Sequence, residues 1–139
     1  MKNLFAVILL GISAVTFAQE VVKVDSANAP VITFEESIFE FGEIMQGDVV
    51  EHVFVFTNTG KSPLILSNVK TTCGCTAPTW PREPIAAGET SEMLVRFNSR
   101  GKSGMQNKTI TIFSNALNAT EKIRIVSQVK LPAQGDSGN

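Results

Sequence analysis

The feature that most constrains the fold is a series of short apolar runs, each separated from the next by a cluster of Gly, Asn, Ser or Pro. Such punctuation is typical of β-strands joined by turns. The run from Val49 to Asn58, "VVEHVFVFTN", follows the two-residue period of a strand. It places Val50, His52, Phe54 and Phe56 on one face and Glu51, Val53, Val55 and Thr57 on the other.

Seven runs of this kind can be recognised after the first 18 residues, and no window there shows the period of an amphipathic helix. Parallel strands need long, usually helical crossovers, so we expect the strands to pair mainly antiparallel. About seven short strands in a little over 100 residues predict an all-β, immunoglobulin-like antiparallel β-sandwich. The runs are Val31–Glu36, Ser37–Ile44, Val49–Asn58, Leu64–Thr72, Ser91–Ser99, Asn107–Asn115 and Glu121–Lys130.

The first 18 residues have the pattern of a signal peptide. Lys2 precedes an uncharged apolar run that ends in the small-residue sequence "TFA", which predicts cleavage after Ala18. The run is shorter than the roughly 20 apolar residues that span a bilayer. We therefore expect an extracytoplasmic protein, periplasmic or secreted, with no membrane span once the signal is removed.

The rest of the chain suits one domain. Residues 19–30 mix charged and small residues and are interpreted as a flexible linker, residues 31–131 as the immunoglobulin-like domain, and residues 132–139 as a disordered tail. The chain carries 12 Lys and Arg residues against 13 Asp and Glu residues, and the basic residues are scattered singly. This charge pattern argues against a nucleic-acid partner or an anionic membrane surface.

Four segments together give a strong resemblance to a known family: "FEFG" from Phe39, "FTNTGKSPL" from Phe56, "CGCTAPTWP" from Cys73 and "PIAAGE" from Pro84. The pattern from about residue 31 to 129 resembles the secreted bacterial domain of unknown function 1573, common in Bacteroidetes. That family is similar to the Hydin-type and major-sperm-protein-like immunoglobulin-like domains, which are binding or assembly modules. The resemblance implies a non-enzymatic role in the cell envelope and supplies no activity or cofactor.

Both cysteines of the chain, Cys73 and Cys75, flank Gly74. In a straight strand they would lie about 6.6 Å apart, too far for a disulfide, so pairing requires a bend, which we expect Gly74 to provide. The enclosed ring is so small that the loop-entropy estimate is roughly 1.6 kcal/mol. One interpretation is therefore a structural pair that shapes the loop. A second is thiol–disulfide exchange, for which only Lys70 and Arg82 offer nearby positive charge.

A third interpretation is metal capture. One histidine is too few for a tetrahedral zinc site in the monomer, whereas Cu(I) could use Cys73 and Cys75 with a thioether. Met45, Met93 and Met105 lack any tight spacing and favour core filling. No metal site or cofactor is predicted, and Cys73 and Cys75 remain weak copper candidates.

The segment after the cysteines is the candidate binding loop. Trp80, the only tryptophan, lies among prolines that stiffen the chain, and can serve either as a binding anchor or as a lid on the sandwich. The loop residues are Thr76, Pro78, Trp80, Pro81 and Arg82. His52 shares a face with Phe54 and Phe56, which favours a structural histidine, and no nucleophile–base–acid set is recognisable. The sequence thus predicts a binding or assembly module without catalytic residues, whose partner is an unidentified protein or envelope glycan.

Overall fold

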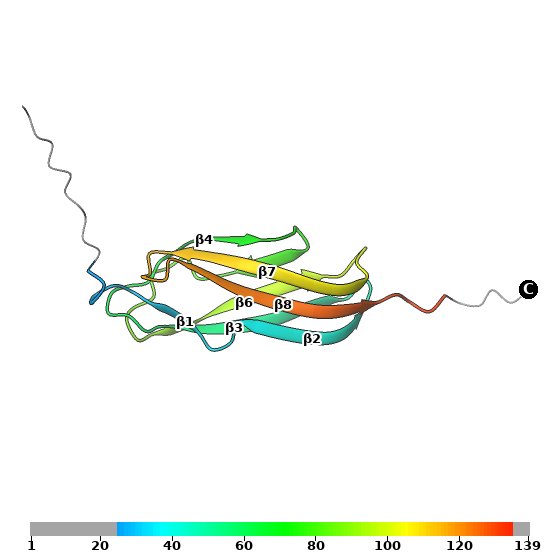
Figure 1. Cartoon of the computed structure of the whole chain (residues 1–139), viewed down its shortest axis with the longest axis horizontal. Helices are drawn as coiled ribbons and strands as arrows, with labels where there is room; N and C mark the ends of the chain where they lie inside the picture. The colour runs from blue at the N-terminus through cyan, green and yellow to red at the C-terminus, as the bar shows by residue number, and fades with distance from the viewer. Residues whose placement is uncertain (1–24, 135–139) are drawn as a thin grey trace, which may run out of the picture.

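A computed structural model describes residues 25–134 as a two-layer β-sandwich (Figure 1). Within those residues there are eight strands and no helix. No helix in this part of the chain is long and apolar enough to cross a membrane. The strands are β1 (Ile32–Phe34), β2 (Ile38–Met45), β3 (Val49–Asn58), β4 (Leu66–Thr71), β5 (Thr76–Thr79), β6 (Thr90–Asn98), β7 (Gly104–Ser114) and β8 (Thr120–Lys130).

The strands form two four-stranded sheets. Sheet A has the order β1-β3-β6-β5, and sheet B has the order β2-β8-β7-β4. All pairings are antiparallel except that of β2 with β8. The parallel pair arises because the chain leaves sheet A after β1, bends, and continues as β2 beside β8 in sheet B.

The predicted fold class is confirmed, and each of the seven predicted runs overlaps one strand. The prediction missed β5, whose sequence "TAPT" has no apolar alternation and contains Pro78. Pro78 is tolerated because β5 is an edge strand, which pairs only with β6. Packing of the adjoining segments, and not local propensity, therefore makes β5 a strand.

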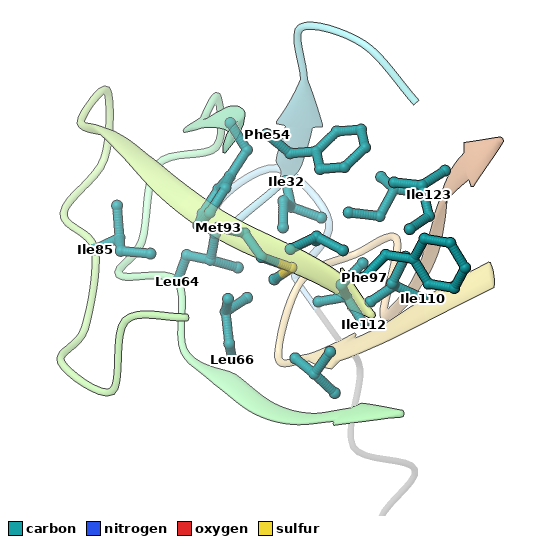
Figure 2. Packing of buried hydrophobic residues seen from close by; sticks show 14 of the residues in the cluster. Ile32, Phe54, Leu64, Leu66, Ile85, Met93, Phe97, Ile110, Ile112 and Ile123 are labelled. Atoms are coloured by element: carbon teal, nitrogen blue, oxygen red, sulfur yellow. The ribbon is translucent and has the colours of Figure 1, made fainter. Parts of the chain in front are cut away.

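The core lies between the two sheets and is built from the inward positions of the alternating strands (Figure 2). Phe54, Phe56 and Phe97 come from sheet A, while Ile110, Ile112 and Ile123 come from sheet B, and all six are fully buried. Burying one such side chain stabilises the fold by about 1.5–3 kcal/mol. The outward positions of the same strands stay half-buried or exposed, as the two-residue period predicts.

Asn58 joins the loops at one end of the sandwich. Its side chain is fully buried, and its amide group donates to the carbonyls of Ser62 (2.8 Å) and Ile85 (2.9 Å). Its side-chain oxygen accepts from the backbone N–H groups of Gly60 (3.1 Å) and Val31 (3.4 Å). Because a buried amide is costly unless it is paired, these four bonds fix the relative positions of three segments.

The predicted signal peptide, residues 1–18, lies outside the described residues, as do residues 19–24 of the predicted linker and residues 135–139 of the predicted tail. Residues 25–28 form a turn in which the Asp25 carboxylate accepts from the Asn28 side chain at 2.7 Å. The first strand begins at Ile32 and the last ends at Lys130. The first and last described residues lie at opposite ends of the sandwich (Figure 1).

Candidate functional site

The structure joins Cys73 and Cys75 as a disulfide, with 5.3 Å between their Cα atoms. The bend that permits this is a turn in which the Thr76 N–H donates to the Cys73 carbonyl at 3.4 Å. The Thr71 hydroxyl donates to the same carbonyl at 2.8 Å, and the Cys75 N–H contacts the Cys73 sulfur at 3.3 Å. Local hydrogen bonds therefore hold the two cysteines close together.

Gly74 lies in this turn, as expected, but its special backbone freedom is not used. Gly74 is not among the glycines with positive φ, and a Cβ atom built on it would meet nothing within 4 Å. Its backbone is therefore open to other residues, and the turn, not a conformation special to glycine, closes the pair.

The disulfide lies where the chain crosses from one sheet to the other. Before it, the Thr72 N–H donates to the Thr109 carbonyl of sheet B at 3.2 Å. After it, the Cys75 carbonyl accepts from the N–H of Asn98, the last residue of β6 in sheet A, at 2.9 Å. Cys75 also packs against the core. The pair thus shapes the crossover that places β5 at the edge of sheet A.

Trp80 follows β5 and packs as the lid that the sequence offered as one of its two roles, while its role as a binding anchor stays a prediction. It is half-buried and packs against the core, and the Arg82 guanidinium lies over its ring, with Cζ 3.8 Å from the ring centroid. This is a cation–π contact. The indole Nε1 is buried and has no hydrogen-bond partner. Trp80 therefore covers the core with part of its surface while another part lines a groove.

That groove crosses the outer face of sheet A and has a volume of about 540 Å³. Trp80 and Pro81 form one wall, and hydroxyl groups and one carboxylate contribute polar atoms. This volume falls within the range of small-ligand sites, roughly 300–1,000 Å³. The lining residues are Val53, Thr79, Trp80, Pro81, Thr90, Ser91, Glu92 and Leu94.

Only part of the predicted binding loop reaches the groove. Trp80 and Pro81 line it, and Arg82 is next to it through its contact with Trp80. Thr76 is buried, with its hydroxyl 3.9 Å from each cysteine sulfur, and Pro78 is half-buried in the edge strand. Thr76 and Pro78 thus belong to the crossover and not to the groove wall.

Sequence reasoning missed the groove residues of β3 and β6. Val53 and Leu94 stand opposite each other in the two strands, on the outer face. The alternation of β3 did place Val53 on the face opposite Phe54, and an apolar residue on an outward face was the signal that could have identified it. No local pattern marks the other groove residues of β6, which are Thr90, Ser91 and Glu92. They lie near Trp80 because β6 is the neighbour of β5 in sheet A, and the sequence does not show the order of the strands.

The cations that could have activated the cysteines have other contacts. The Lys70 ammonium lies 5.6 Å from the Phe113 ring centroid, and Arg82 stacks on Trp80. Of the candidate thioethers, Met93 is fully buried in the core, whereas Met45 and Met105 are exposed. Within the described residues there is no group of three or more His, Cys, Asp or Glu side chains that could hold a metal ion.

His52 has a structural setting. Its ring stacks on Phe39 with a centroid distance of 3.5 Å, meets Phe54 edge-on at 4.8 Å, and contacts the Glu36 carboxylate through Nε2 at 2.5 Å. Phe39 belongs to sheet B and His52 to sheet A. The histidine therefore ties the two sheets together beside the bend between β1 and β2.

Comparison with known proteins identifies the family. The family model described as "Protein of unknown function (DUF1573)" matches residues 32–129, from the first strand to the last. The chain belongs to this family. The resemblance recognised in the sequence is thereby confirmed. No curated protein matches the chain.

Solved structures similar to this DUF1573 chain support the same fold. A protein of unknown function from Porphyromonas gingivalis W83 matches with a TM-score of 0.67 and 16% identity, over 78% of this chain and 51% of that one. PapD-like domain 7 of human CEP192 matches with a TM-score of 0.62 and 10% identity, over 88% and 99%. The secreted serine protease VesC from Vibrio cholerae matches with a TM-score of 0.56 and 14% identity, over 71% and 23%.

The DUF1573 chain thus spans about half of the Porphyromonas protein and less than a quarter of the protease. At these identities the likeness shows the fold alone, an immunoglobulin-like sandwich. Folds of this class serve many unrelated functions, so the function must be argued from the surface of this chain.

Proposed function

We propose that this DUF1573 protein is a non-enzymatic binding or assembly module of the cell envelope that works outside the cytoplasm. The observation that carries the proposal is the groove on sheet A, where an aromatic wall faces hydroxyl groups and a carboxylate. Binding sites commonly combine an apolar surface with a few polar groups that fix orientation. Trp80 supplies the apolar area, and Thr90, Ser91 and Glu92 supply the polar groups.

Two further observations support the location and the absence of catalysis. Disulfides persist mainly in oxidising compartments, which agrees with the predicted signal peptide at residues 1–18. The lone histidine contacts two phenylalanines and a carboxylate, an arrangement that stabilises packing. The resemblance of the fold to PapD-like and other immunoglobulin-like modules points in the same direction.

The partner class is a protein or a glycan of the envelope, bound in the groove. Site-specific photo-crosslinking in cells tests this. A photoreactive residue replaces Thr90, which lines the groove on β6, and a matched control replaces Lys122, an exposed residue of β8 in sheet B. We expect a defined crosslinked product from position 90 and none from position 122, in the extracytoplasmic fraction.

The chain also carries its own reporter. Trp80 is its only tryptophan, so its fluorescence reports directly on the groove. We expect the emission to shift on titration with the crosslinked partner or with purified envelope polysaccharide. The proposal fails if position 90 gives no product in cells and the fluorescence stays constant, or if the mature protein is found in the cytoplasm.

A further inference from the structure

One half of β3 presents an unpaired backbone edge. The backbone N–H and C=O groups of the even-numbered residues of β3 point toward β6. This is shown by the bond from the Ser99 N–H to the Asp48 carbonyl and by that from the Asn58 N–H to the Glu89 carbonyl, both 2.9 Å. The backbone groups of the odd-numbered residues point to the opposite side of β3, the side of β1, where the Glu35 N–H donates to the Val55 carbonyl at 3.0 Å. Backbone groups alternate sides along a strand.

On that other side β3 meets β1 only at its far end. The pairing with β1 covers residues 56–58, after which the chain bends at residues 35–37 and joins sheet B as β2. Among residues 25–134 no strand pairs with this side of Val49, Glu51 and Val53. Both backbone groups of each of these three residues therefore point to an open edge, which we call the β3 edge.

The edge strands of sheet A carry blocking devices that the β3 edge lacks. On β1, the Asn118 amide imitates a neighbouring strand, because it accepts from the Ile32 N–H at 3.1 Å and donates to the Ile32 carbonyl at 2.8 Å. On β5, Pro78 removes a donor. The backbone carbonyl of Cys75 points toward β6, so the backbone groups of Thr76 and Pro78 point away from β6, toward the free edge. Free edges invite pairing with other chains, and such devices prevent it.

The edges of sheet B are interrupted in a similar way. Strand β2 has a bulge between Glu40 and Gly42, and its Met45 N–H is bound by the Asp48 carboxylate at 2.9 Å. Strand β4 has a bulge between Leu66 and Asn68, and the Asn68 side chain accepts from the N–H of the next residue at 2.9 Å. Bulges break the regular row of donors and acceptors that a further strand would need.

The β3 edge, by contrast, is regular and accessible. The pairing of β3 with β6 runs from residue 49 to residue 57 without a register shift, and residues 49–53 include neither Pro nor Gly. The Val49 and Val53 side chains on the outer face are 52% and 39% exposed. Two exposed valines on a straight, unpaired edge are the surface that an added strand would cover.

We propose that the β3 edge binds an extended segment of another polypeptide, which adds to sheet A as a further strand beside Val49–Val53. This deepens the proposed function by naming the partner class and a second contact surface. The segment would donate to and accept from the backbone groups of Val49, Glu51 and Val53, as in strand addition generally. Its side chains on the outer face would pack against the two valines.

Charge defines the segment further. Asp48 precedes the edge, Glu51 lies in its middle, and Glu35 and Glu36 lie at its other end, all four exposed. His52 contacts Glu36, and Arg96 contacts Glu51 at 2.5 Å. A segment whose outward side chains run β-branched, Lys or Arg, β-branched complements the outward row Val49, Glu51 and Val53. A second copy of the chain fits less well, because symmetrical antiparallel pairing would place Glu51 opposite the same residue.

The test uses the full mature protein and a synthetic probe, the blocked heptapeptide Thr-Val-Thr-Lys-Thr-Val-Thr, whose second, fourth and sixth side chains share one face. Amide hydrogen exchange is followed by NMR with and without the peptide. We expect the N–H groups of Val49, Glu51 and Val53 to exchange at least about tenfold more slowly when the peptide is bound, since each gains a hydrogen bond. The same peptide N-methylated at two adjacent central residues is the control and should not bind.

A pair of variants separates backbone pairing from charge. Glu51→Pro removes an N–H that points away from β6, so the ladder within sheet A stays intact. Both variants lose the contact between the Glu51 carboxylate and Arg96, but Glu51→Ala keeps the backbone N–H group. We expect Glu51→Pro to bind the peptide about tenfold more weakly than Glu51→Ala, which corresponds to one lost hydrogen bond. If Glu51→Pro loses its near-ultraviolet circular dichroism, the variant has not folded. The comparison of the N-methylated and unmethylated peptides on the native chain then tests the backbone pairing.

Three results would overturn the proposal. They are equal binding of the N-methylated and unmethylated peptides, exchange at Val49, Glu51 and Val53 that the peptide leaves unchanged, and protection of these amides by dimerisation without peptide. The last result would assign the edge to a second copy. Because crosslinking at position 90 reports on the groove and hydrogen exchange reports on the β3 edge, failure of this proposal is distinguishable from failure of the proposed function.

Discussion

Replacing Gly60 by Ala should destabilise the protein strongly. A Cβ atom on Gly60 would lie 2.3 Å from the Ala29 carbonyl oxygen, 2.4 Å from the Val31 nitrogen and 2.5 Å from the Pro30 Cα atom. All three are backbone atoms, so no side-chain rotation can relieve the overlap. The segment that leads into β1 must move away from the loop that follows β3.

The magnitude follows from what that movement breaks. Overpacking alone costs about 1–3 kcal/mol. The displaced segment also holds the bond from the Thr59 N–H to the Val31 carbonyl (2.9 Å) and that from the Lys61 N–H to the Ala29 carbonyl (3.3 Å). Each contributes about 1 kcal/mol. We expect the free energy of unfolding to fall by about 3–5 kcal/mol, a large part of the about 5–15 kcal/mol typical of a domain.

Urea unfolding followed by Trp80 fluorescence measures the change, and the chain provides a matched control. At Gly74 a Cβ atom would meet nothing within 4 Å, and φ is not positive. Gly74→Ala should therefore change the free energy of unfolding by less than about 1 kcal/mol and can even stabilise through the unfolded chain. Equal midpoints for Gly60→Ala and the native protein would refute the reasoning, and so would a large loss for Gly74→Ala.

Three further predictions concern other contacts. Asn118→Ala leaves the backbone groups of Ile32 without their side-chain partner and should lower the free energy of unfolding by about 1–3 kcal/mol, measured in urea; an unchanged value would contradict the capping role. Cys73→Ser combined with Cys75→Ser should cost no more than about 1.6 kcal/mol, because the disulfide closes a three-residue ring; a loss of native near-ultraviolet circular dichroism would contradict this. Trp80→Ala should lower Tm by several degrees, since a loss of about 1 kcal/mol in the free energy of unfolding lowers Tm by about 4–8 °C in a domain of this size. An unchanged Tm would show that Trp80 does not cover the core.

The fold was predictable because the signal repeats along the chain. In β3 the alternation assigned Phe54 and Phe56 to the buried face, and both are fully buried. In the same way Ile110 and Ile112 alternate with polar residues and are buried. The two-residue period depends only on backbone geometry, so it holds wherever one side of a sheet faces the core.

The site was less predictable because it depends on contacts between distant segments. The sequence identified Trp80 but not the Val53 and Leu94 side chains that share its groove, since they meet only through the order β3-β6-β5. The amide clamps were also missed. Asn58 and Asn118 stand in turn-like sequences, and nothing local indicates that Asn118 reaches Ile32 of the first strand.

The polar clamps and the open edge follow from one physical requirement. A sandwich of two four-stranded sheets has edges whose backbone groups must bind water, a side chain or another strand. On β1 the Asn118 side chain meets this need, and on β5 Pro78 reduces it. On Val49–Val53 neither device is present, although a single Pro or a bulge would suffice. The same property that makes this edge a liability for aggregation makes it suited to a specific partner strand. Its lack of protection is therefore a second structural argument for a binding role, beside the groove on sheet A.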